Sequence, residues 1–265
     1  MANLIHSAKT AGAWTTADLD SYNITLLPQN AASFFDTQHL PQSTVNPEIL
    51  SVQNASDMTI SDNQLLINLL DLAMIPAHGQ EESAVTDFMV YLFHTLHYSS
   101  GHHIAQTCRD FQLYICGKWR QAKINVCLFD CHQCNMILLV QEDKHFRDGG
   151  MAQANAQAQL IAKAVAAFSW NNRQREEAGQ PLLESKIIPG IVMKGSLPTF
   201  FKIPVTQQLV TAIMHGQYPA EPTIVAVHFP DLSQPNLNWS EGMKPLDNRK
   251  HVLNCYEAFK AIVGI

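Results

Sequence analysis

Two apolar segments joined by a short polar turn constrain the fold of this chain more than any other feature. Residues 124–129 and 136–141 are rich in β-branched and aliphatic side chains, and residues 130–135 between them are polar. This pattern predicts an antiparallel β-hairpin. In the register that such a turn favours, facing residues have numbers that add up to about 265 to 267, which places Asn125 opposite the neighbourhood of Glu142.

The second strand of this hairpin ends in a glutamate and a lysine two residues apart, Glu142 and Lys144. Side chains alternate along a strand, so both lie on one face. A carboxylate is a ligand that Mg²⁺ prefers, and an ammonium beside it can orient an attacking water or balance charge that develops on a phosphate. The pair therefore indicates metal-dependent phosphodiester cleavage, whereas a solvated strand end is the competing interpretation.

Segments spread over most of the chain resemble a group of uncharacterised proteins from mushroom-forming fungi (basidiomycetes), and that group looks like a branch of the PD-(D/E)XK nuclease superfamily. The segments are residues 82–88, 116–118, 125–130, 140–144, 158–168, 171–172, 189–195, 201–206 and 216–219. The resemblance implies an α/β fold with a restriction-endonuclease-like core, in which helices flank a central mixed sheet. That core would be a helix, a three-stranded antiparallel meander, a second helix and a further strand.

The same resemblance implies roles for individual residues. It puts Glu142 and Lys144 on the third strand of the meander as catalytic residues, with Glu142 also binding Mg²⁺ or Mn²⁺. It makes Glu82, on the first helix, an accessory metal ligand, and it adds Gln159, on the second helix, to the catalytic site. From the residues alone, Glu82 could instead stabilise a helix N-terminus through the helix dipole, and Gln159 could be an interior amide bonded to backbone.

One position departs from the superfamily pattern. Asn125 stands where the motif aspartate is expected and is the third predicted metal ligand. An amide oxygen can bind a hard cation, but it carries no charge, so the electrostatic hold on the ion is weaker. Asp130 cannot substitute, because it lies roughly 17 Å further along the strand. Asp110, on the preceding predicted strand, is the alternative carboxylate.

The charge balance limits the partners that this chain can attract. A net charge of −6 opposes general attraction to nucleic acid, because Lys and Arg dominate phosphate binding. A local patch of Lys163, Arg173 and Arg175 is the predicted nucleic-acid-binding surface, with a solvated helix end as the competing interpretation. Because of this local patch, nucleic acid remains the candidate partner. The sequence does not define an oligomeric state.

The first residues lack the long apolar stretch of a secretory signal, and no segment reaches the length of a membrane span. A cytoplasmic or nuclear location is therefore expected, and the six cysteines are expected to be reduced thiols. Cys127, Cys131, His132 and Cys134 suggest a zinc site, because thiolates at short spacing suit zinc. A cysteine-bearing turn without metal is the competing interpretation.

Hydrophobic periodicity divides the chain into an N-terminal arm, residues 1–60, packed on a domain of residues 61–265. The predicted helices are 62–74, 81–97, 152–172, 207–214 and 251–262, and the predicted strands are 111–116, 122–129, 136–143, 187–194, 199–204 and 223–229.

Three functions compete for this sequence. The first is a Mg²⁺- or Mn²⁺-dependent nuclease that uses Glu142, Lys144 and Asn125. The second is a catalytically inactive relative that binds nucleic acid, protein or another ligand in the same cleft. The third is a fungal defence or storage protein in which the nuclease-like core is only a scaffold. Glu142 and Lys144 favour the first function, whereas the acidic net charge and Asn125 favour the other two.

Overall fold

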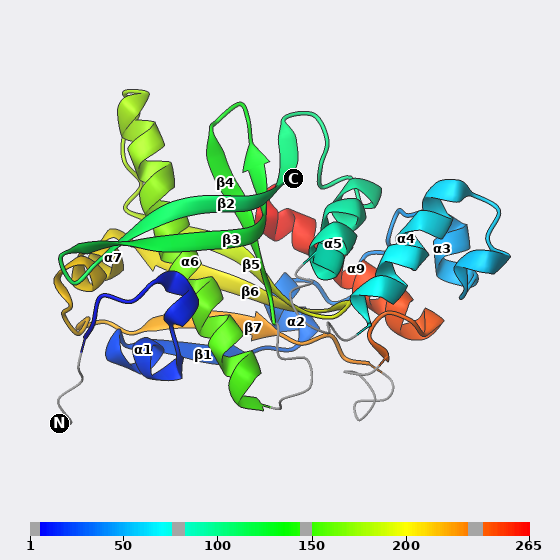
Figure 1. Ribbon diagram of the computed structural model, residues 1–265, viewed down its shortest axis with the longest axis horizontal. Helices are drawn as coiled ribbons and strands as arrows, with labels where there is room; N and C mark the ends of the chain where they lie inside the picture. Colours follow the sequence, from blue (N-terminus) through cyan, green and yellow to red (C-terminus); the bar gives the residue numbers. More distant parts are fainter. Residues whose placement is uncertain (1–5, 76–82, 144–149, 233–240) are drawn as a thin grey trace.

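The computed structural model describes residues 6–75, 83–143, 150–232 and 241–265, and its strands form one mixed, open sheet (Figure 1). The seven strands lie in the order β1-β7-β6-β5-β4-β3-β2. They are β1 (Ile24–Pro28), β2 (His103–Ile115), β3 (Lys118–Asp130), β4 (Asn135–Glu142), β5 (Ser185–Lys194), β6 (Leu197–Thr206) and β7 (Thr223–His228). The predicted α/β class, with a central mixed sheet flanked by helices, is thus confirmed.

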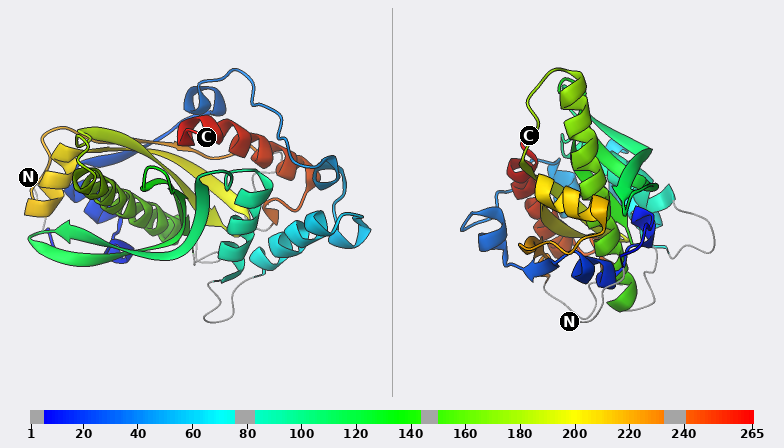
Figure 2. Two further views of the ribbon diagram at one scale, coloured as in Figure 1. Left: turned by 90° about the horizontal axis from the view of Figure 1, so that it is seen from above. Right: turned by 90° about the vertical axis from the view of Figure 1, so that its left-hand side faces the viewer.

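Helices cover both faces of this sheet, and Figure 2 shows α6 and α9 on opposite sides of it. The helices are η1 (Ala11–Ala13), α1 (Thr16–Ser21), α2 (Ala31–Phe35), α3 (Pro47–Ser51), η2 (Ala55–Asp57), α4 (Ser61–Ala73), α5 (Ser83–Thr95), α6 (Gly150–Glu177), α7 (Gln207–His215) and α9 (Leu246–Val263). Two apolar layers result. The α6 layer also holds α1 and α7, and the α5 layer also holds α2, α4 and α9.

Small residues let α6 approach the centre of the sheet. Ala158, Ala162 and Ala166 of this helix are fully buried. At Gly190 of β5, an added methyl group would lie 2.9 Å from Leu160 Cδ2 and 3.2 Å from Ile203 Cδ1. With a larger residue at this position, the Leu160 side chain would have to shift for the helix to keep its observed distance.

The strands β2, β3 and β4 form the predicted antiparallel meander. Val126 of β3 pairs with Val140 of β4, which confirms the register expected from the turn. The chain then crosses the sheet through α6 and returns as β5, which runs parallel to β4 from Leu139–Gly190 onward. The element order from α5 to β5 is thus helix, three antiparallel strands, helix and strand.

The long β2–β3 hairpin changes the direction of its side chains at Asn125. Ile124 packs in the α6 layer and Val126 in the α5 layer, although strict alternation would put both on one face. On the facing strand, the ladder omits Cys108, whose φ is +52°. Such an irregularity bends a strand pair, and Figure 1 shows both strands changing direction along their length.

The N-terminal arm does more than cover the domain, because β1 pairs in parallel with β7 at one edge of the sheet. At the other end of the arm, the buried Arg249 of α9 uses five N–H groups to donate to five backbone carbonyls. They belong to Ile49, Val52, Gln53, Met243 and Lys244, at 2.8 to 3.2 Å. Burial lowers the pKa of this guanidinium to about 10.

Two adjacent asparagines hold α6 to neighbouring backbone segments. The Asn171 amide accepts from Met136 N at 2.9 Å and donates to Met136 O at 3.0 Å, and Asn172 makes the same pair of bonds with Leu183. Asn171 is fully buried. β5 pairs with β4 only from Leu139 to Glu142, so it does not reach Met136. At Met136 the Asn171 amide makes the hydrogen bonds that a neighbouring strand would otherwise make.

A carboxylate organises the start of α4. The helix begins at Ser61 with Ile60 as its N-cap. Beside its first turn, the half-buried Glu48 accepts hydrogen bonds from Thr59 N, Ile60 N and Asn63 Nδ2. Hydrogen bonds to the charged carboxylate lower the pKa of Glu48 to about 2, and the bond from Thr59 N has the largest effect.

Candidate functional site

Glu142 is the last residue of β4, and its side chain points toward the α5 layer. Leu138 and Val140 belong to that layer, whereas Leu139 packs against α6. Alternation therefore assigns Glu142 to the face that α5 and α9 cover. Its side chain is half-buried, which suits a carboxylate that must meet both protein and solvent.

Asn125 lies at the same end of the β3–β4 hairpin as Glu142. Because Val126 faces Val140, the same register puts Asn125 beside Gln141, one residue from Glu142. Asn125 is half-buried and sits at the irregularity of β3. Together the two residues bring one carboxylate and one amide oxygen to the same end of the hairpin, and these are donors that a hard divalent cation accepts.

Two other predicted site residues, Glu82 and Lys144, lie outside the described residues. The chain is described from Ser83 at the start of α5 and up to Asp143 after β4. Their predicted roles as accessory metal ligand and catalytic lysine therefore remain predictions.

A second polar group lies on the α6 side of the same strand ends, and the sequence did not predict it. Asp143, Lys163 and Lys194 are at most 9% exposed. Lys163 Nζ donates to Gln141 Oε1, and Gln141 Nε2 donates to the carbonyl of Glu142 at 2.6 Å. The backbone at Glu142 is thus connected through Gln141 to α6. The sequence feature that could have predicted this group is the polar residue at the end of each of two apolar strands, Asp143 after β4 and Lys194 in β5.

Lys163 corrects the predicted nucleic-acid-binding patch. Its side chain is 5% exposed and bonded inside the protein, so it cannot reach a phosphate backbone. The prediction failed because the lysine lies on the side of α6 that faces β4, where it bonds to Gln141. Gln159, one turn earlier on α6, is half-buried, and its catalytic role remains a prediction.

The two arginines of that patch both interact with the protein. The Arg173 guanidinium lies 5.4 Å from the centre of the Trp119 ring, and Arg175 Nε donates to Pro181 O at 2.8 Å. Arg173 is exposed and Arg175 is half-buried. A contact of Arg173 with phosphate stays open to test, whereas Arg175 is already engaged at the helix end.

The two alternative aspartates differ in position from Glu142. Asp130 pairs with Asn135 at the opposite end of the hairpin, where its Oδ1 accepts from His132 N and Gln133 N. Asp130 therefore stabilises the turn. Its position far from Glu142 agrees with the distance along the strand that the sequence predicted.

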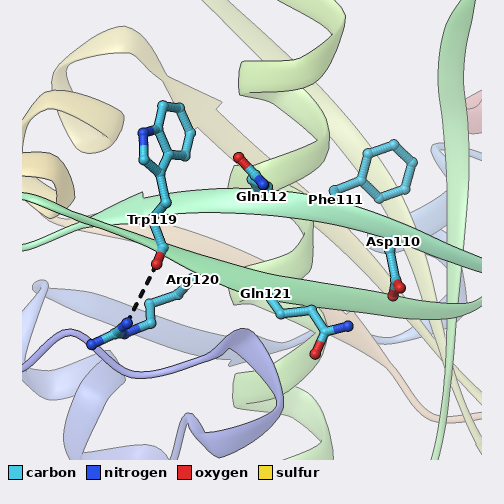
Figure 3. A pocket seen from close by; sticks show the side chains of 6 residues that line it. All are labelled: Asp110, Phe111, Gln112, Trp119, Arg120 and Gln121. Carbon is cyan, nitrogen blue, oxygen red and sulfur yellow. Dashed lines mark hydrogen bonds between the residues drawn. The ribbon is translucent and has the colours of Figure 1, made fainter.

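Asp110 of β2 pairs with Lys123 of β3, and β3 lies between β2 and β4. Figure 3 shows its carboxylate pointing away from the Phe111 ring. It borders a hollow of about 410 Å³ lined by Asp110, Phe111, Gln112, Trp119, Arg120 and Gln121. Asp110 therefore lies in separate surroundings from Glu142.

The cysteines at the hairpin turn do not gather metal ligands. Cys127 is buried in β3, and burial raises its thiol pKa to about 11. Cys131 and Cys134 are exposed in the turn. Across the residues that the structure describes, no three His, Cys, Asp or Glu side chains form a group that could hold a metal ion.

The fold and these residues define an α/β protein with a mixed open sheet and polar groups at the carboxyl ends of β4 and β5. The chain matches none of the known protein families and none of the curated proteins with which it was compared. Among the helices in the described ranges, none has the length and apolar character needed to cross a membrane.

Proposed function

We propose that this protein is a metal-dependent nuclease of the PD-(D/E)XK type. One observation supports this most: the chain runs from α5 through the β2–β3–β4 meander to α6 and β5, and Glu142 ends the third meander strand on the α5 side. This element order and carboxylate position agree with what the superfamily resemblance implies, and this agreement supports the proposal. In this proposal Glu142 and Asn125 bind the cation, and Lys144 orients the attacking water.

Mg²⁺ or Mn²⁺, when bound, would polarise the phosphate and activate water. The oxygen donors at Glu142 and Asn125 fit a hard cation in kind. They supply one negative charge, and Glu82 would supply the second. The Gln141 amide holds the Glu142 carbonyl, so the carboxylate starts from a fixed backbone position.

A catalytically inactive protein that binds its ligand in the same cleft is the second candidate. Asn125 favours it, because the uncharged amide weakens the hold on a divalent cation. The net charge of −6 also disfavours broad attraction to nucleic acid. A third candidate is a fungal defence or storage role in which the nuclease-like core is only a scaffold.

Plasmid digestion tests the nuclease proposal directly. We expect weak nicking that is stronger with Mn²⁺ than with Mg²⁺, because Mn²⁺ tolerates a less regular ligand geometry, and no nicking in EDTA. Glu142→Ala should abolish the activity, whereas Glu177→Ala, which removes an exposed glutamate at the end of α6, should not change it. Nicking of equal rate in the Glu142→Ala protein would exclude this site.

Asn125→Asp separates a weakened nuclease from an inactive binding protein. A carboxylate beside Glu142 should tighten Mn²⁺ binding by about 1–3 kcal/mol, on the order of ten- to hundredfold in Kd. Calorimetric titration of Mn²⁺ into both proteins measures this change. An unchanged Kd together with a loss of binding in Asp110→Asn would show that Asp110 is the ligand, and absence of binding in every variant would favour the scaffold role.

A further inference from the structure

The turn between β3 and β4 carries two exposed cysteines three residues apart, and the proposed nuclease site at the other end of the hairpin does not use them. Cys131 and Cys134 flank His132 and Gln133. We propose that these two cysteines are a thiol–disulfide site, which a low-molecular-weight disulfide such as oxidised glutathione converts to an intramolecular Cys131–Cys134 disulfide.

The geometry of the turn brings the two side chains together. The pair Asp130–Asn135 closes the hairpin, so the turn contains only the four residues 131–134. Residues three apart in such a turn have Cα atoms within about 7 Å, and disulfides need about 4.4–6.8 Å. The Cys134 backbone is left-handed, with φ +52°, and its Sγ lies 3.8 Å from the Cys131 carbonyl oxygen. Cys134 therefore already folds back over Cys131.

Hydrogen bonds hold the turn in this shape before any oxidation. Asp130 Oδ1 accepts from His132 N at 2.8 Å and from Gln133 N at 3.1 Å. Cys131 N donates to the His102 carbonyl at 2.8 Å. A fixed turn keeps the second thiol at a high effective concentration near the first, which favours an intramolecular disulfide over two separate adducts.

The exchange balances without a further reactant. One cysteine thiolate attacks a sulfur of the oxidant, the oxidant's S–S bond breaks, and one glutathione thiolate leaves. The second cysteine thiolate attacks the protein sulfur of this mixed disulfide, and the other glutathione leaves. The protein loses two electrons and two protons. The electrons reduce the oxidant, and the two glutathione thiolates take up two protons, so oxidised glutathione becomes two thiols.

The other cysteines provide controls within the same chain. Cys127 and Cys255 are buried, and burial raises their thiol pKa values to about 11 and about 12, so few thiolates form there. Cys108 is exposed like the pair but lies in β2. It should take one glutathione as a stable adduct.

The test is incubation of the reduced full-length protein with mixtures of oxidised and reduced glutathione, followed by alkylation and peptide mass analysis. We expect the peptide with Cys131 and Cys134 to lose about 2 Da, the mass of two hydrogens, and to regain them with dithiothreitol. Cys131→Ser and Cys134→Ser should each carry at least about tenfold more glutathione at the remaining turn cysteine, because the second exchange step is missing. Cys108→Ser should behave like the wild type.

Three outcomes would overturn the proposal. The first is a wild-type turn that keeps both thiols or accumulates adducts as the single variants do. The second is a disulfide that links either turn cysteine to Cys108 or to a second molecule. The third is a zinc ion that stays with the purified protein in a one-to-one ratio and is lost in both single variants, because the thiolates would then be metal ligands.

Discussion

Arg249→Met is expected to lower the free energy of unfolding by more than about 3 kcal/mol. The substitution keeps an unbranched apolar stem but removes every hydrogen bond to the five carbonyls. Three of those carbonyls, of Ile49, Val52 and Gln53, lie at the end of α3, where helix carbonyls have no partner within the helix. Their loss should also release the N-terminal arm from α9.

Urea denaturation measures this effect, with Lys250→Met as the matched control. Lys250 is the exposed neighbour of Arg249 on the same helix, so its replacement should change stability by less than about 0.5 kcal/mol. Arg249→Lys should lie close to Arg249→Met, because an ammonium cannot reproduce the planar fork of five donors. Equal unfolding midpoints for the Arg249→Met and Lys250→Met proteins would contradict the proposed role.

Asn171→Leu is expected to destabilise the protein by about 2–4 kcal/mol, since it leaves one buried N–H and one buried carbonyl of Met136 without a partner. Asn171→Asp should cost at least as much. A carboxylate can still accept from Met136 N, but it repels the carbonyl to which the amide donated. The start of β4 would lose both hydrogen bonds to α6 in Asn171→Leu and one of them in Asn171→Asp.

The control for Asn171 is Gln174→Leu on the same helix. Gln174 Nε2 bonds only to the Glu177 carboxylate in an exposed position, so its removal should have little effect. Hydrogen exchange at the Met136 amide gives a local measurement beside the unfolding curve. Unchanged protection of that amide in Asn171→Leu would show that the side chain does not hold the strand.

The sequence determined the elements whose hydrophobic pattern is strong and local. The meander strands near 122–129 and 136–143 and the helix near 152–172 were predicted, and the structure has them as β3, β4 and α6. The register of β3 and β4 followed from a turn of fixed length. Distance along the strand also excluded Asp130 as a partner of Glu142. Each of these inferences depends on residues within about one hairpin or helix of each other.

Where the local hydrophobic pattern was weak, the sequence did not predict strands that the structure contains. In β1 only Ile24 is fully buried, so no alternation marks this strand, and backbone bonds to β7 define it instead. The part of β2 before residue 111 is mostly polar and either half-buried or exposed, because it lies at the sheet edge. Backbone pairing forms a strand at an edge whatever the side chains are.

Only the tertiary structure determined which polar and charged side chains are buried and which groups they bond to. Lys163 and Arg173 belong to one helix, yet the first is buried against Gln141 and the second is exposed beside Trp119. Arg249 bonds to carbonyls about 200 positions earlier in the chain. The physical reason is that a charge is buried only where packing brings enough partners to it. Those partners come from segments that no local pattern connects.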